Sequence, residues 1–245
     1  MNELALFAGI GGGILGGILS GFKIVCAVEI EQYCREVLLQ RQRDGIFPFF
    51  PVWDDVRTFD GTKWRGIVDV ITAGFPCQPF SVAGKQKADL DERNMWPSTL
   101  RIIEEVRPQW ILLENVPNLL AGSHGYFGQI LSDLDKIGYS ARWGCLSAST
   151  VGAPHKRERL WIVATNSNFK RLAQSKLWET PCRKERDEQP PIESFLISFW
   201  TPGFGKISDI PGVDDGNARR VDRLKAVGNG QVPAVAATAW EVLSR

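Results

Sequence analysis

An α/β fold, with a mostly parallel sheet covered by helices on both faces, is predicted by the alternation of short apolar runs with amphipathic stretches. Each run is short and bounded by turn residues or charges, as buried strands are. The five runs are residues 4–8, 24–28, 68–73, 110–114 and 160–165. Helical patterns fill residues 31–43, 98–106 and 127–137, and Pro97 stands where a first helical turn tolerates proline.

The alternation stops near Thr165, where the composition changes. Residues 166–222 are polar, carry many charges and contain five prolines, which predicts a small irregular second module. Residues 232–243 are rich in alanine and apolar on one side, which predicts a helix that returns to the first domain. The predicted organisation is a main domain over residues 1–165, a module over 166–222 and a returning segment over 223–245.

The composition of the 245-residue chain is that of an ordinary globular protein, with 44% hydrophobic and 23% charged residues. No apolar run reaches the roughly 18 residues that a membrane span needs, and no secretory signal is visible, so we expect a cytoplasmic protein. Five cysteines without a CxxC pair, beside two histidines, argue against a zinc site. Because the net charge is only +1, binding of a polyanion would require a local basic face.

A strand that runs into glycines near the amino terminus predicts a ligand-binding turn. Glycine lets the backbone approach a ligand closely, and ligands of open parallel sheets bind beyond the carboxyl ends of the strands. Glu29 ends the next strand and could accept both hydroxyls of a ribose, and Asp55 follows a further strand-like segment. The pattern favours a nucleoside-containing cofactor over a tight turn with a solvated glutamate. The GxGxxG spacing is satisfied by Gly11, Gly13 and Gly16.

Two more strand ends carry side chains of types that take part in catalysis. Residues 74–81 read Gly-Phe-Pro-Cys-Gln-Pro-Phe-Ser, and the prolines would hold Cys77 on a rigid turn, placed as a nucleophile would be. Simple packing of this thiol is an equal alternative. Glu114 ends a strongly apolar strand, where partial burial would raise its pKa and suit it to hold a proton. The alternative is an ordinary strand-terminal acid in a salt bridge.

A basic segment precedes the last predicted strand. Alternation along an extended chain would put Arg157 and Arg159 on the same side. Two guanidinium groups there could bind a carboxylate, a phosphate or a base edge. A solvated basic turn is the alternative.

Together these segments resemble the cytosine-5 DNA methyltransferase family of prokaryotic or phage type, in order and approximate spacing. Residues 7–12 resemble its first motif, 74–81 its Pro-Cys motif, 114–116 its ENV motif, 155–159 its QRRER motif and 228–229 its final GN motif. The resemblance covers about residues 1–165 and 220–245. The chain departs from the residue types common in the family at Ala5, His155 and Gly230, and no clear ninth motif is present, although Arg219 and Arg220 could do its work.

The resemblance implies a Rossmann-like, S-adenosylmethionine-dependent methyltransferase fold. It implies methyl transfer to C5 of a flipped-out cytosine in duplex DNA through a covalent adduct at C6. Cys77 would be the nucleophile and Glu114 would contact N3 of the base. Arg159 would bind O2, with Arg157 as a neighbouring contact. No metal is required.

The resemblance also assigns residues to S-adenosyl-L-methionine. Phe7 would pack on the adenine and the backbone of residues 9–12 would approach the methionine part. Glu29 would hold the ribose hydroxyls and Asp55 would accept from the adenine amino group. The implied cofactor set is Phe7, Gly9, Gly11, Gly12, Glu29, Asp55 and Asn229.

By the same resemblance, residues 166–222 form the target-recognition module. Its basic residues could contact phosphates, which position a protein on DNA without specifying sequence. We expect a monomer that associates with the nucleoid through DNA, with a possible cognate restriction endonuclease as partner. The basic residues are Lys170, Arg171, Lys176, Arg183, Lys184 and Arg186.

Three alternatives compete with this hypothesis. A tRNA cytosine-5 methyltransferase would share the core motifs, but such enzymes usually carry a Cys-Phe-Thr tripeptide, which this chain lacks. A nicotinamide-dependent oxidoreductase would explain the glycine spacing but would leave Cys77, Glu114 and Arg159 without a role. A DNA-binding relic of a methyltransferase is disfavoured by the intact cysteine and glutamate.

Overall fold

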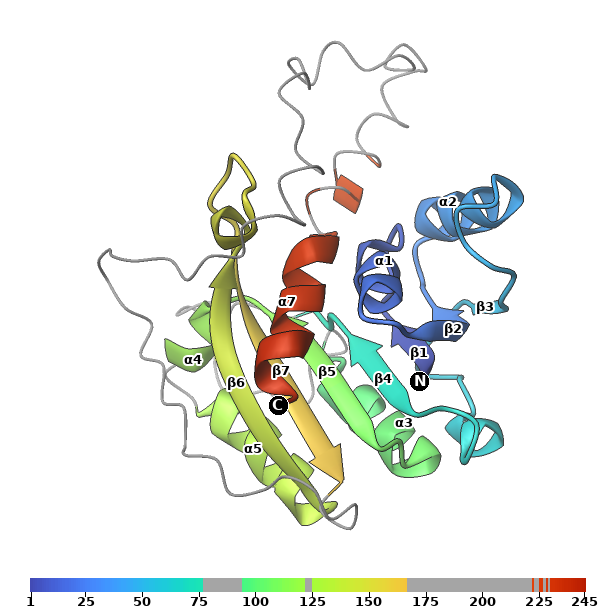
Figure 1. Cartoon of the computed structure of the whole chain (residues 1–245). Coiled ribbons are helices and arrows are strands. Elements are labelled where there is room, and N and C mark those ends of the chain that lie inside the picture. The colour runs from blue at the N-terminus through green and yellow to red at the C-terminus, as the bar shows by residue number, and fades with distance from the viewer. Residues whose placement is uncertain (77–93, 122–124, 167–221, 223–224, 227, 229) are drawn as a thin grey trace.

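The computed structural model describes residues 1–76, 94–121, 125–166, 222, 225–226, 228 and 230–245. In this part of the chain a seven-stranded sheet has the order β3-β2-β1-β4-β5-β7-β6 (Figure 1). The strands are β1 (Asn2–Leu6), β2 (Lys23–Val28), β3 (Val52–Trp53), β4 (Val70–Ala73), β5 (Trp110–Asn115), β6 (Tyr139–Ser147) and β7 (Glu158–Asn166). The helices are α1 (Gly12–Leu19), α2 (Gln32–Arg43), α3 (Trp96–Val106), α4 (Asn118–Ala121), α5 (Tyr126–Lys136) and α7 (Pro233–Leu243), with 3-10 turns η1 (Gly61–Trp64) and η3 (Ala148–Val151).

The sheet is mostly parallel, as predicted. β1 pairs in parallel with both β2 and β4, and β3 and β5 extend this parallel part on either side. β7 runs in the opposite direction to the other described strands, because it pairs antiparallel with β5 and with β6. The winding reverses direction between β1 and β4, and in such sheets a ligand site lies beyond the carboxyl ends of the strands at this point. The predicted α/β class is confirmed.

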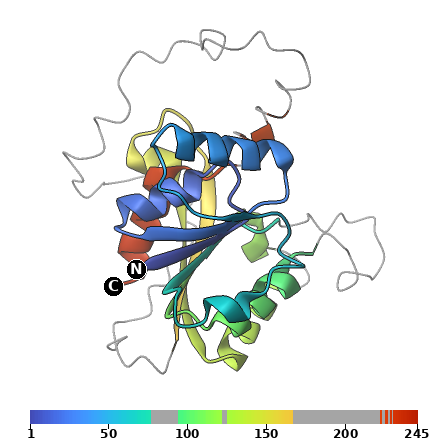
Figure 2. The ribbon, with the colours of Figure 1, turned by 90° about the vertical axis from the view of Figure 1, so that its right-hand side faces the viewer.

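Helices cover both faces of the sheet. In Figures 1 and 2, α3 and α5 lie on one face, while α1 and α7 lie on the other. The strands supply side chains to the two faces alternately. On β5, Ile111 and Leu113 pack in the core under α3 and α5, whereas Leu112 joins the cluster under α7. The strands thus separate the apolar core under α3 and α5 from two clusters on the other face, one under α7 and one that contains Ile14 of α1 and Leu38 of α2.

Several elements differ from their predicted bounds by one or two residues, and one strand was not predicted. The first strand ends at Leu6 and not at residue 8, because Phe7 adopts a left-handed φ of 54° and turns the chain away from the sheet. The long strand β6 was not predicted. It lies at the sheet edge and is half-buried along most of its length, so its sequence shows neither a continuous apolar run nor a clean alternation. α3 begins two residues before its predicted start and has Pro97 in its first turn.

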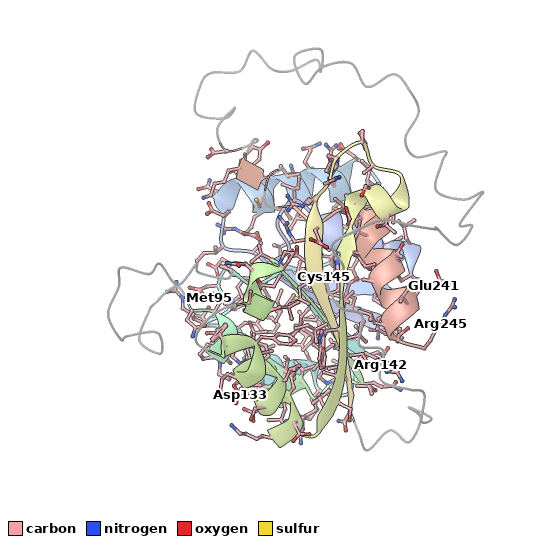
Figure 3. The ribbon with its side chains drawn as sticks, turned by 90° about the vertical axis from the view of Figure 1, so that its left-hand side faces the viewer. Met95, Asp133, Arg142, Cys145, Glu241 and Arg245 are labelled. Carbon is pink, nitrogen blue, oxygen red and sulfur yellow. The ribbon has the colours of Figure 1, made fainter. Side chains whose placement is uncertain are left out.

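The predicted returning helix is present as α7. It approaches α1 so closely that a Cβ at Gly16 would lie 2.6 Å from the Cβ of Ala236. The Trp240 ring meets the edge of Trp110 on β5, with ring centroids 5.2 Å apart. At its far end Arg142 of β6 donates to the backbone carbonyl of Arg245 (Figure 3). α7 therefore packs against α1 and against the sheet.

A fully buried carboxyl group lies between β1 and α1. Glu3 on β1 accepts a hydrogen bond of 2.7 Å from the hydroxyl of Thr72 on β4, and it lies against Gly17 of α1. Among the described residues nothing hydrogen-bonds its Oε2. Burial raises the pKa of Glu3 to about 8, so the protonated form prevails in the folded protein at neutral pH.

The predicted module at 166–222 falls almost wholly outside the described residues, and the three-segment organisation stays a prediction. None of the helices in the described ranges is long and apolar enough to cross a membrane.

Candidate active site

A small cavity of about 40 Å³ opens at the carboxyl ends of β1 and β4, where the winding of the sheet reverses. Its walls come from three parts of the chain that are far apart in sequence: the turn after β1, the ends of β4 and β5, and the segment before α7. The residues that matter here are Phe7, Gly9, Gly74, Glu114, Gly230 and Gln231. The predicted cofactor turn and the predicted catalytic glutamate thus share one cavity.

The glycine turn between β1 and α1 needs glycine for two different reasons. Gly9 has a φ of 54° with open space where a Cβ would be, so its backbone conformation favours glycine and its surface is free for a ligand. Gly11 and Gly12 are instead in close contact with the protein itself. A Cβ at Gly11 would lie 2.6 Å from the Phe47 ring, and one at Gly12 would lie 2.2 Å from the carbonyl oxygen of Gln231.

Glu29 follows β2 directly and is buried, with 6% of its surface exposed. Its Oε2 accepts a hydrogen bond of 2.6 Å from the Gly9 amide, and its Oε1 accepts one of 2.8 Å from the Glu31 amide. The carboxylate therefore fixes the glycine turn. Since each carboxylate oxygen has two acceptor positions, it retains acceptor capacity for a ligand.

Asp55 lies beyond β3 and is bound by a neighbour. Arg57 donates to it from Nε and Nη2, and the shorter contact, from Nη2 to Oδ2, is 2.7 Å. The hydrogen bond from the Arg57 guanidinium holds the pKa of this carboxyl below its usual range. A ligand amino group at Asp55 would share the carboxylate with this guanidinium.

Glu114 ends β5 with 8% of its surface exposed. Its Oε1 lies 2.9 Å from Nε of Arg159, which antiparallel pairing of β7 with β5 brings to this end of the strand. Burial raises the pKa of Glu114, while the positive charges of Arg159 and Arg157 and a side-chain hydrogen bond from Gln231 oppose the rise. Both features that the sequence left open, a buried acid and a salt bridge, occur together.

Arg157 makes contacts that the sequence did not indicate. Its Nη1 donates to the Gly228 carbonyl at 2.6 Å and its Nη2 to the Gly230 carbonyl at 2.8 Å. The guanidinium thus holds the backbone of the segment before α7, while its charge still acts on Glu114.

Two residues of the site were missed by sequence reasoning. Asn115 was noted only as part of a motif, yet its side chain donates to the carbonyl of Phe75 at 3.2 Å and so ties the end of β5 to the chain just before Cys77. Gln231 was not singled out, although it follows the recognised Gly228-Asn229 pair by two positions. The feature of the sequence that could have pointed to Gln231 is its amide side chain, which directly follows the glycine-rich residues 228–230.

Cys77 and Asn229 lie outside the described residues. Of the cysteines that are described, Cys26 and Cys34 are buried, and burial raises their pKa values to about 12 and about 11. Thiols of such high pKa form little thiolate, so these two are packing residues rather than nucleophiles.

Known proteins support the interpretation of the motifs. The family described as C-5 cytosine-specific DNA methylase matches residues 1–199. The Type II methyltransferase M.NgoMIV of Neisseria gonorrhoeae is 35% identical over 202 residues, which cover 80% of this chain and 59% of that protein. The Type II methyltransferase M.CviJI of Paramecium bursaria Chlorella virus IL3A is 34% identical over 170 residues, covering 69% of this chain and 44% of that protein.

A solved structure agrees with these sequence matches. The structure of a mutant of DNMT2 from Spodoptera frugiperda superposes with a TM-score of 0.57 at 27% identity, over 78% of this chain and 55% of that chain. The chain spans about half the length of the relatives it matches. The resemblance read from the motifs is confirmed, and the chain belongs to the C-5 cytosine-specific DNA methylase family.

Proposed function

We propose that this protein is a DNA (cytosine-5)-methyltransferase that uses S-adenosyl-L-methionine and acts on duplex DNA. The observation that carries the proposal is the position of Glu114. This buried glutamate, paired with Arg159, shares a cavity with the glycine turn at the point where the sheet reverses its winding. A proton-holding acid and a cofactor turn are thus adjacent, as methyl transfer to a base requires.

Membership of the methylase family and the donor groups of the described residues support S-adenosyl-L-methionine as the cofactor, which supplies an electrophilic sulfonium methyl group when bound. Glu29 is buried at the strand end and retains acceptor positions for ribose hydroxyls. Gly9 leaves open space at its surface. We assign cofactor binding to these two residues together with Phe7, Gly11, Gly12, Asp55 and Asn229. Asp55 would divide its carboxylate between Arg57 and the adenine amino group.

The chemistry assigned to the base begins at Cys77. Its thiolate adds to C6, forming an S–C6 bond and displacing the C5–C6 π electrons, which makes C5 nucleophilic. Glu114 holds a proton at N3 to balance the charge that the ring gains, and its raised pKa favours this protonated form. Arg159 orients the base through O2. After transfer, a water molecule takes the C5 proton, the C5–H electron pair re-forms the C5–C6 double bond, and the S–C6 bond breaks to release the thiolate of Cys77.

The family resemblance implied that Arg157 contacts the base next to Arg159. We assign it a different role. Because its guanidinium donates to two carbonyls before α7, we assign it to the support of that segment.

The substrate and its recognition follow from the same proposal. A base inside a duplex cannot reach a buried acid, so the cytosine must be flipped out, at a cost of a few kcal/mol. We assign sequence choice to residues 166–222 and their basic side chains. We also propose a monomer that acts in the cytoplasm on nucleoid DNA. The Type II designation of the relatives supports a place in a restriction-modification system with a cognate endonuclease.

The test uses duplex DNA with 5-fluorocytosine at the target position. Fluorine at C5 cannot leave as a proton, so a covalent protein–DNA adduct should accumulate on denaturing gels only when S-adenosyl-L-methionine is present. The variant Cys77→Ser should form no adduct and transfer no methyl group, while its thermal unfolding matches that of the parent. Methylation of normal DNA without any adduct on fluorinated DNA would rule out the covalent route.

The alternative substrate is tRNA, and the same preparation decides between the two. Methylation of tRNA, with duplex DNA left unmodified, would replace the DNA assignment. The lack of a Cys-Phe-Thr tripeptide favours DNA. Mapping the methylated cytosines in the DNA of expressing cells then identifies the recognised sequence.

A further inference from the structure

We propose that Gln231 is a positioning residue, whose side-chain amide holds the Glu114 carboxylate in one orientation and thereby makes the segment before α7 part of the active site. The proposal deepens the proposed function, because it assigns a support for the acid on which that function rests. Four observations carry it.

The first observation is the fit of Gln231 among three glycines. A Cβ at Gly12 would lie 2.2 Å from the Gln231 carbonyl oxygen, one at Gly13 would lie 2.3 Å from its Oε1, and one at Gly74 would lie 2.7 Å from its Nε2. These distances are far shorter than any real Cβ contact. Gln231 therefore occupies the space that glycine leaves on the cofactor turn and at the end of β4.

The second observation is the contact with the acid. The Gln231 side chain hydrogen-bonds to Glu114. A Cβ at Gly74 would also lie 3.1 Å from Oε2 of Glu114, so the amide nitrogen and this oxygen lie around the same glycine. Arg159 binds the other oxygen, Oε1, at 2.9 Å. The carboxyl group is thus held from two sides, by a guanidinium and by an amide.

The third observation is that Arg159 and Gln231 differ in the hydrogen bonds that their side chains can make. A guanidinium only donates hydrogen bonds, so Arg159 stabilises the charged carboxylate. A primary amide both donates and accepts, so Gln231 can donate to the carboxylate and, after rotation of the amide, accept from the protonated acid. A partner of the second kind can therefore hold an acid in one orientation both before and after it releases its proton.

The fourth observation is that Gln231 is itself held in place. Arg157 binds the backbone just before it, at Gly228 and Gly230. Directly after it the chain enters α7, which packs against α1 through the close approach of Ala236 to Gly16. A side chain anchored on both sides has little freedom to lose when it binds Glu114, which is the requirement for a positioning residue.

The experiment compares two glutamine variants. Gln231→Met keeps the length of the side chain but removes the amide. Gln42→Met is the matched control, because Gln42 is a buried glutamine on α2 whose side-chain amide donates to the Phe50 carbonyl at 3.1 Å. The readout is the titration of glutamate carboxyl carbons by NMR, with the Glu114 signal assigned by its loss in Glu114→Gln.

We expect the Glu114 titration midpoint to rise in Gln231→Met, because the amide binds the charged carboxylate more strongly than the protonated acid, and to stay unchanged in Gln42→Met. The single-turnover methylation rate should fall roughly tenfold in Gln231→Met alone. An unchanged midpoint in a folded Gln231→Met protein would overturn the proposal. If this variant does not fold, Gln231→Asn, which is one methylene shorter, carries the same test. A parent without methylation activity would refute the proposed function, while the titration would still decide the role of Gln231.

Discussion

Replacing Glu3 by glutamine is expected to stabilise the fold increasingly as the pH rises. The carboxyl group has a pKa of 4.5 when exposed and of about 8 when buried in the folded protein. Between these values the unfolded chain releases a proton that the folded chain retains, so the folded state loses stability with rising pH. Each pH unit costs about 1.4 kcal/mol. At pH 7 the cost is about 3 kcal/mol, an upper value because local relaxation would reduce it.

Glutamine removes this cost because it cannot ionise, and its carbonyl oxygen can still accept from Thr72. Urea unfolding of the parent and of Glu3→Gln, measured between about pH 5 and pH 8, gives the difference in unfolding free energy directly. The difference should grow in favour of the variant across this range. Glu104→Gln, at an exposed position, is the control and should show no such trend. A difference that does not change with pH would refute the reasoning about the buried carboxyl group.

Three further substitutions test contacts of the carboxyl-terminal segment. Gly16→Ala places a methyl group against Ala236 and should lower the unfolding free energy by about 1–3 kcal/mol; an unchanged melting curve would show that α1 and α7 separate without cost. In Gly74→Ala the added methyl group collides with the side-chain amide of Gln231, so the methylation rate should fall by roughly tenfold or more while the fold is retained. Full activity of this variant would contradict the tight fit. Arg157→Lys cannot span two carbonyls, so amide hydrogen exchange in α7 should accelerate; exchange as slow as in the parent would argue against the anchor.

Much of the fold could be predicted because its buried strands are short apolar runs with clear ends. β5 is an example, since Trp110–Asn115 is apolar up to its final acid and amide. β6 escaped prediction because a half-buried edge strand lacks that pattern. The true end of β1 could not be predicted either, since the left-handed conformation of Phe7 depends on its surroundings and not on its residue type.

The site was predictable only where local sequence carries the information. The burial of Glu114 follows from the apolar strand before it, and the raised pKa follows from the burial. The bonds from Arg157 to Gly228 and Gly230 join residues 71 and 73 positions apart, and no local pattern reports such pairs. The role of Glu29 as an anchor for the glycine turn was hidden for the same reason, because it arises from contact between two loops.

The late position of α7 in the chain has a consequence for protein synthesis. In the described part of the chain, the seven strands are complete by Asn166, but α7 begins only at Pro233. Until the residues before and within α7 have emerged, Gly12, Gly13 and Gly74 face an unfilled space and Glu114 lacks its amide partner. The site around Glu114 is therefore incomplete until α7 has been made, and the sheet face that α7 covers is exposed until then.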